Sequence, residues 1–209
     1  ARLAATTLEA LGAAVHYDQG QFHMTAGALR GAAMLLDECS VMATENAVLA
    51  AVTASGTTII RNAASEPHVQ DLCHFLNRLG GRIENIGSNC LVIEGVPALG
   101  GGEYDIGADY LEVASYIGAA AVTGGEIRIE QAGVAHLDMV RLVFDRLGVR
   151  WTTEGDDVLV PSAMSAQLAM AIAGSTLHIA PWGAHAINVT QPDLFNSVLL
   201  DFLDRIRRG

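Results

Sequence analysis

The chain repeats itself at an interval of 68 residues, and this repeat constrains its fold more than any other feature. A Leu-Gly pair recurs at this interval, at 11–12, 79–80 and 147–148. An apolar helical stripe precedes each pair, and two short alternating segments joined by a turn follow it. Repetition at a fixed interval indicates that one supersecondary unit is used several times. After Pro161 the sequence follows no repeat.

Each full copy predicts a strand, a helix, a strand, a helix and then two strands in a hairpin. In the middle copy we expect these elements at 33–38, 44–54, 57–63, a helix that ends at Leu79, and a hairpin over 81–95. In the last copy we expect them at 103–107, 111–122, 126–132, 134–147, and a hairpin over 149–161. Helices packed on one face of small mixed sheets form an α/β (α+β layered) fold.

The repeat also predicts how the chain is divided. We expect a partial first unit at 1–30, full units at 31–98 and 99–161, and a closing helix-strand-helix segment at 162–209. The first unit has no counterpart of the elements that open the other two. We expect the closing segment to cover the core left open there, giving a single compact domain. A homodimer through uncovered apolar surface is the alternative.

Charge composition excludes several function classes. Arg supplies all 12 basic residues, so no lysine can serve a P-loop or a Schiff base. The net charge of −11 argues against nucleic acid, which is bound through basic surfaces. No segment is apolar enough to span a membrane, and no signal peptide opens the chain, so we expect a cytoplasmic protein. Neither cysteine nor histidine spacing indicates a metal site, and we expect no cofactor.

The run SVMATENAVLAAV, followed by GTTIIRNAASEPHVQDLCHFLNRLGGRI and LGGGEYDIGADYLEVASYIGAAAVTGGEI, resembles the enolpyruvyl transferases. The likeness covers residues 1–161. Members of that family fold as two inverse α/β domains, each built from three such units. The resemblance therefore implies that this chain forms most of one inverse α/β domain.

The resemblance also implies a binding site. Ser40, Val41 and Met42 match the family's Ser-Val-Gly turn, which holds the diphosphate of a UDP sugar. A serine and free amides at a helix entrance suit an anion. Met42 departs from the family's glycine, and Glu38 stands where a basic residue is common and would repel a diphosphate. The alternative is that Ser40 only caps the following helix.

The family's catalytic groups have no identified counterpart in this chain. Enolpyruvyl transfer requires a proton donor for the enol carbon and cations around the phosphate. The family's Lys-Asn pair, and its loop with an acid and an arginine, match nothing between residues 1 and 209. We therefore expect an incomplete domain that binds a UDP sugar weakly and has no transferase activity.

A second resemblance concerns residues 157–209, which are similar to the C-terminal end of an α/β-hydrolase. Asp157, four residues before Pro161, and His185 in GAHAINV match that family's triad positions. The nucleophile elbow is absent, and Ser115 in VASYIG is the nearest substitute. The resemblance implies a chimeric chain and, as an alternative function, hydrolysis of simple esters with an unidentified nucleophile. Otherwise His185 is an ordinary loop residue.

Overall fold

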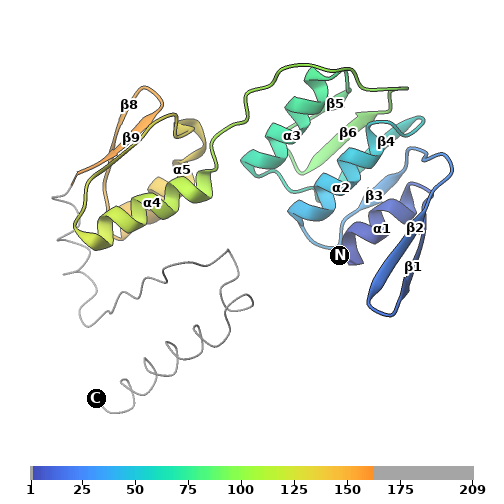
Figure 1. The fold of residues 1–209 in the computed structure, drawn as a ribbon, viewed down its shortest axis with the longest axis horizontal. Helices are drawn as coiled ribbons and strands as arrows, with labels where there is room; N and C mark the ends of the chain where they lie inside the picture. Colours follow the sequence, from blue (N-terminus) through green and yellow to red (C-terminus); the bar gives the residue numbers. More distant parts are fainter. Residues whose placement is uncertain (1, 162–209) are drawn as a thin grey trace, which may run out of the picture.

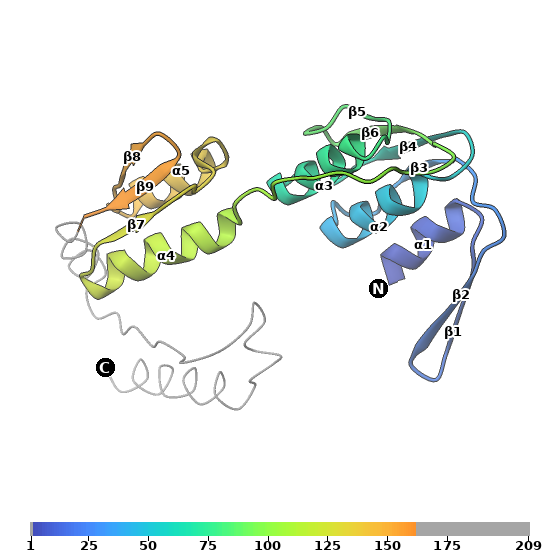
Figure 2. The same ribbon diagram turned by 45° about the horizontal axis from the view of Figure 1, so that its top comes forward.

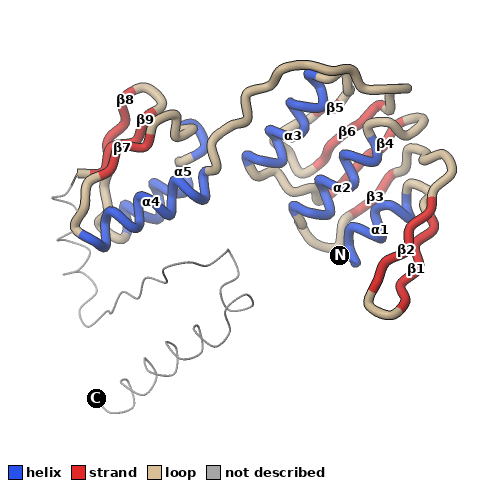
Figure 3. The backbone as a smooth tube through the Cα atoms, viewed as in Figure 1, coloured by secondary structure: helices blue, strands red, loops and turns tan. Residues whose placement is uncertain are grey.

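The structure, a computed structural model, describes residues 2–161, and the predictions that concern residues 162–209, His185 among them, lie outside the described residues. The first two units contain α1 (Arg2–Ala10), β1 (Ala14–Asp18), β2 (Gln21–Thr25), β3 (Ala33–Leu35), α2 (Val41–Ala51), β4 (Thr57–Arg61), α3 (Pro67–Arg78), β5 (Ile83–Glu84) and β6 (Cys90–Glu94). The third contains α4 (Tyr110–Thr123), β7 (Ile127–Ile129), the 3-10 turn η1 (Val134–His136), α5 (Asp138–Arg146), β8 (Thr152–Glu154) and β9 (Asp157–Val160). Figures 1 and 3 show their arrangement.

The second unit is a layer of helices on one face of a four-stranded sheet of order β3-β4-β6-β5. Strand β3 runs parallel to β4, and the other neighbouring pairs are antiparallel. Along β4, Thr58 and Ile60 are buried while Thr57 and Arg61 are exposed, as expected for a strand with one face against helices. Helices α1, α2 and α3 lie side by side over that face (Figures 1 and 2).

Helix α2 is the centre of this core because its small residues allow close packing. Ala43, Ala47, Val48 and Ala51 are almost fully buried. They pack in one cluster with the sheet residues and with α3. A helix that is apolar around much of its circumference is stable only when other elements cover it. The alanine-rich sequence therefore places α2 between α1, α3 and the sheet.

The third unit repeats the second, which confirms the layered α/β fold. Its sheet order β7-β9-β8 matches β4-β6-β5. The register repeats at the 68-residue interval as well, since Ile59 pairs with Val92 and Ile127 pairs with Val160. The same hydrophobic pattern thus produces the same strand pairing twice.

One expectation about the third unit is wrong. The strand expected at 103–107 does not form, because this segment packs on α3 instead. Tyr104 donates a hydrogen bond to the Asp71 carboxylate at 2.6 Å, and its ring meets Phe75 edge-on. The described residues form two apolar clusters, one in units one and two and one in the third unit. The expectation that residues 162–209 pack on them to give a single compact domain stays a prediction.

No helix between residues 2 and 161 is long and apolar enough to cross a membrane.

Two buried threonines, Thr44 and Thr58, allow a test of how α2 is anchored. The Thr44 hydroxyl donates to the Ser40 carbonyl at 2.8 Å and accepts from the buried Ala64 amide at 2.9 Å. Thr44→Val keeps the shape but leaves that amide without an acceptor, so we expect a loss of about 2 kcal/mol in the free energy of unfolding. Urea denaturation followed by circular dichroism measures it.

Thr58→Val is the matched control. Thr58 is equally buried, and its hydroxyl has no hydrogen-bond partner among the described residues. Replacing this hydroxyl by a methyl group should leave the stability unchanged or raise it by up to about 1 kcal/mol. Equal losses in the two variants would contradict the anchoring role of Thr44.

Candidate functional site: the N-terminus of α2

Ser40 is the N-cap of α2. Its backbone is extended (φ −93°, ψ 122°), and its hydroxyl oxygen accepts a hydrogen bond from the Ala43 amide at 3.3 Å. Its carbonyl accepts from the Thr44 amide at 3.0 Å, which closes the first turn. The helix predicted at 44–54 thus begins three residues late, since α2 begins at Val41. The capping role weighed for Ser40 is what the structure shows.

Capping leaves room for a ligand at the same place. Between residues 2 and 161, no group accepts a hydrogen bond from the backbone amides of Val41 and Met42. The Ser40 hydroxyl accepts one hydrogen bond and still has its own proton to donate. These donors lie at the positive end of an 11-residue helix, where an anion is favoured.

The surroundings of this helix end are acidic rather than basic. Asp37 and Glu38 are exposed just before the turn. Cys39 is also exposed, and its thiol donates to the Ala63 carbonyl at 3.3 Å. The Met42 side chain, which replaces the family's glycine, is 64% exposed. The turn therefore offers backbone donors to an anion, and the three described residues just before it, 37–39, include carboxylates and no basic residue.

The residues of the hydrolase alternative are engaged elsewhere. Asp157 at the start of β9 accepts from the Gln131 amide at 3.0 Å and pairs with Arg128 at 2.7 Å. The Gln131 hydrogen bond and then Arg128 hold the pKa of Asp157 below its ordinary value. The Ser115 hydroxyl donates to the Leu111 carbonyl in the middle of α4 rather than standing on a strand-to-helix turn. Within residues 2–161 no hydrogen bond joins Ser115 to Asp157.

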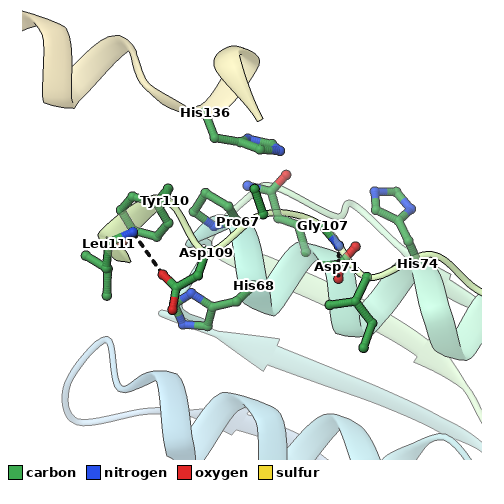
Figure 4. Close-up of a pocket in the computed structure, with 12 residues that line it drawn as sticks. Pro67, His68, Asp71, His74, Gly107, Asp109, Tyr110, Leu111 and His136 are labelled. Atoms are coloured by element: carbon green, nitrogen blue, oxygen red, sulfur yellow. Dashed lines mark hydrogen bonds between the residues drawn. The ribbon is translucent and has the colours of Figure 1, made fainter. Parts of the chain in front are cut away.

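A pocket of about 520 Å³ lies between α3, the start of α4 and η1, and it was not predicted (Figure 4). His68 stacks on Tyr110 with ring centroids 6.2 Å apart, and His74 and His136 also line the pocket. Its lining comes from segments far apart in the sequence: Pro67, His68, Gln70, Asp71, His74, Ile106, Gly107, Ala108, Asp109, Tyr110, Leu111 and His136.

The two carboxylates of this pocket serve the structure. Asp71 accepts hydrogen bonds from the Tyr104 hydroxyl and from the Gly107 amide. The hydrogen bond between Tyr104 and Asp71, together with burial and the Asp71 charge, raises the pKa of Tyr104 to about 12. Asp109 caps α4 through the Leu111 and Glu112 amides. In the described part of the chain, no group of histidine, cysteine or acidic side chains is arranged to hold a metal ion. With no arginine in its lining, the pocket is unsuited to a diphosphate.

Comparison with known proteins agrees with this fold. The sequence model of the EPSP synthase (3-phosphoshikimate 1-carboxyvinyltransferase) family matches residues 2–188. The chain therefore belongs to this family of enolpyruvyl transferases.

Among individual relatives, the chain is similar to a UDP-N-acetylglucosamine 1-carboxyvinyltransferase. The protein of that name from Treponema denticola is 48% identical over 84% of this chain, and the one from Bradyrhizobium diazoefficiens is 49% identical over 85%. In both cases the chain spans only 41% of the relative's length. Of the solved structures, the enolpyruvyl transferase NikO from Streptomyces tendae shares the fold, with a TM-score of 0.67 and 24% identity over 76% of this chain and 41% of its own.

The family match also bears on the end of the chain. It continues to residue 188 and so includes His185. Nothing in these similarities supports a hydrolase-derived tail, and the expectation of a chimera is without support.

Two substitutions test the cap. Ser40→Ala removes the side-chain acceptor for the Ala43 amide and should lower the free energy of unfolding by about 1 kcal/mol. Ser40→Asp keeps an acceptor and adds a negative charge at the helix N-terminus, so its stability should equal that of the parent. Urea denaturation measures both, and a stable Ala variant would contradict the capping role.

Proposed function

We propose that this chain binds the diphosphate of a UDP sugar at the N-terminus of α2, as part of an enolpyruvyl transferase. The observation that carries the proposal is the turn Ser40-Val41-Met42, which presents a hydroxyl and two amides without an acceptor among residues 2–161 at a helix N-terminus. The similar proteins named as UDP-N-acetylglucosamine 1-carboxyvinyltransferases support the choice of anion.

The affinity should be low. Backbone amides and the helix dipole favour an anion by about 1 kcal/mol at an exposed site. The carboxylates of Asp37 and Glu38 act against them, and none of the described residues 37–42 is an arginine. A UDP sugar should therefore bind weakly and in a way that depends on salt concentration.

We do not expect residues 1–209 alone to catalyse enolpyruvyl transfer. The reaction requires a proton donor and cations that neutralise the phosphate in the transition state. The pocket between α3 and α4 lacks arginine, and Arg128 is bound to Glu154 and Asp157. The activity of a whole transferase would require residues that the present sequence does not supply.

The ester hydrolase is not proposed as a second function. Asp157 is held by Arg128, and Ser115 is bound within α4. If any hydrolysis of p-nitrophenyl acetate is detected, we expect the His185→Ala variant to retain all of it. A loss of more than tenfold in that variant would restore the hydrolase alternative.

Charge substitution tests the binding proposal most simply. Glu38→Gln removes one negative charge beside the turn, and a unit charge about 6 Å away in water is worth about 0.7 kcal/mol. We therefore expect UDP-N-acetylglucosamine to bind this variant at least about threefold more tightly, as measured by isothermal titration calorimetry at low salt.

Glu84→Gln is the matched control, because Glu84 is an equally exposed carboxylate on the strand β5. It should leave the affinity unchanged. If neither the parent nor Glu38→Gln binds the nucleotide sugar at millimolar concentration, the proposal is wrong, and equal gains in both variants would indicate a non-specific charge effect instead.

A further inference from the structure

The segment that joins the second unit to the third is a long loop that lies along α3. Residues 95–109, here called the strap, form neither helix nor strand between the end of β6 and the start of α4. Figures 1 and 2 show the strap passing beside α3. A loop of this length without secondary structure is uncommon in a compact domain unless it has a functional role. The contacts that hold the strap on α3 indicate what that role is.

One carboxylate holds the strap where it passes the N-terminal half of α3. The two oxygens of Asp71 have separate donors, since Oδ1 accepts from the Tyr104 hydroxyl at 2.6 Å and Oδ2 accepts from the Gly107 amide at 3.3 Å. The Tyr104 hydroxyl also lies 3.3 Å from the Asp71 carbonyl oxygen, and its ring meets Phe75 edge-on. The Gly107 amide therefore depends on the carboxylate alone, whereas Tyr104 has further contacts with α3.

The strap is firmly attached at its start and flexible directly afterwards. Leu99 packs against the apolar cluster of units one and two, and the Gly100 amide donates to the Leu79 carbonyl at 2.7 Å. Three glycines then follow one another at 100–102, and glycine has the fewest restrictions on its backbone. Further along, Ile106 is 86% exposed, so apolar burial does not hold this part of the strap. The hydrogen bonds of Asp71 do so instead.

The part of the strap that Asp71 holds is one wall of the pocket beside α3 (Figure 4). Ile106, Gly107 and Ala108 line the pocket from the strap, and His68 and His74 line it from α3. The position of this wall depends on Asp71 because Gly107 is itself one of the two donors.

We propose that the strap is a gate for this pocket, which swings about the glycines at 100–102 and is held shut by Asp71. The structure shows the closed state. In the open state, water replaces the two donors on the Asp71 carboxylate, and the pocket loses the wall formed by residues 106–108. The net free energy of such hydrogen bonds is small because water can replace either partner, so the gate opens without unfolding α3. Asp71 is thus a positioning residue, which shapes the pocket through the strap.

Amide hydrogen exchange of the full ¹⁵N-labelled chain tests the gate. The Gly107 amide reports on the strap, and the buried Ala64 amide, which donates to Thr44, reports on unfolding of the second unit. Asp71→Ala removes the acceptor of Gly107 and should raise the exchange rate of that amide at least tenfold, while the rate of Ala64 stays within twofold of the parent.

Asp105→Ala is the matched control. Asp105 is an exposed carboxylate on the strap itself, and its side chain has no hydrogen bond or ion pair among the described residues. This variant should leave both exchange rates unchanged. A gate also requires the pocket to change with the strap, so the amide resonance of His136, which lines the pocket from η1, should shift in Asp71→Ala and not in Asp105→Ala.

Three results overturn the proposal: a Gly107 rate that Asp71→Ala does not change, an equal rise in Asp105→Ala, and a His136 resonance that stays in place. Exchange of Gly107 and Ala64 at one common rate overturns it as well, because the strap would then open only when the unit unfolds. If Asp71→Ala does not fold, Tyr104→Phe decides, since it removes one of the two donors and should raise the Gly107 rate at least threefold. No rise in that variant overturns the gate.

Discussion

The Thr44 hydroxyl joins the start of α2 to the loop that follows β4, and the rest of the second unit depends on this connection. It accepts a hydrogen bond from the buried amide of Ala64, and it donates to the carbonyl of Ser40. A buried helix end without such partners would be costly. Because Thr44 fixes the first turn from inside, Ser40, Val41 and Met42 are held at the outer end of α2, where two amides have no acceptor in the described part of the chain. The hydrogen bonds of the Thr44 hydroxyl therefore support both the core packing and the candidate anion site.

The repeat allowed most of the fold to be predicted. The apolar spacing on either side of each Leu-Gly pair is local, and local patterns determine helices and hairpins. The strand expected at 103–107 was wrong for a physical reason that the pattern does not contain. Its alternation suits a strand, but Tyr104 finds the carboxylate of Asp71, 33 residues earlier, and a hydrogen bond at that separation cannot be read from neighbouring residues.

The site was predicted in part, since Ser40 could be read either as a cap or as an anion ligand. The structure shows the cap, and the capped turn still has donors to offer. The pocket beside α3 was missed because His68, Asp109 and His136 come from three separate segments that only the fold brings together. The hydrolase interpretation depended on the position of Asp157 four residues before Pro161 and on His185 in the GAHAINV segment. Strand β7 pairs with β9 of the β8–β9 hairpin, and Arg128 on β7 forms a salt bridge with the Asp157 carboxylate. This carboxylate therefore has a structural role.

The central claim is that the α2 N-terminus binds the diphosphate of a UDP sugar, and amide chemical shifts test it most directly. In a titration of the ¹⁵N-labelled chain with UDP-N-acetylglucosamine, the amides of Val41 and Met42 should move most, and the pocket residues Tyr110 and His136 should not move. Shifts confined to that pocket, or none at millimolar ligand, would contradict the account.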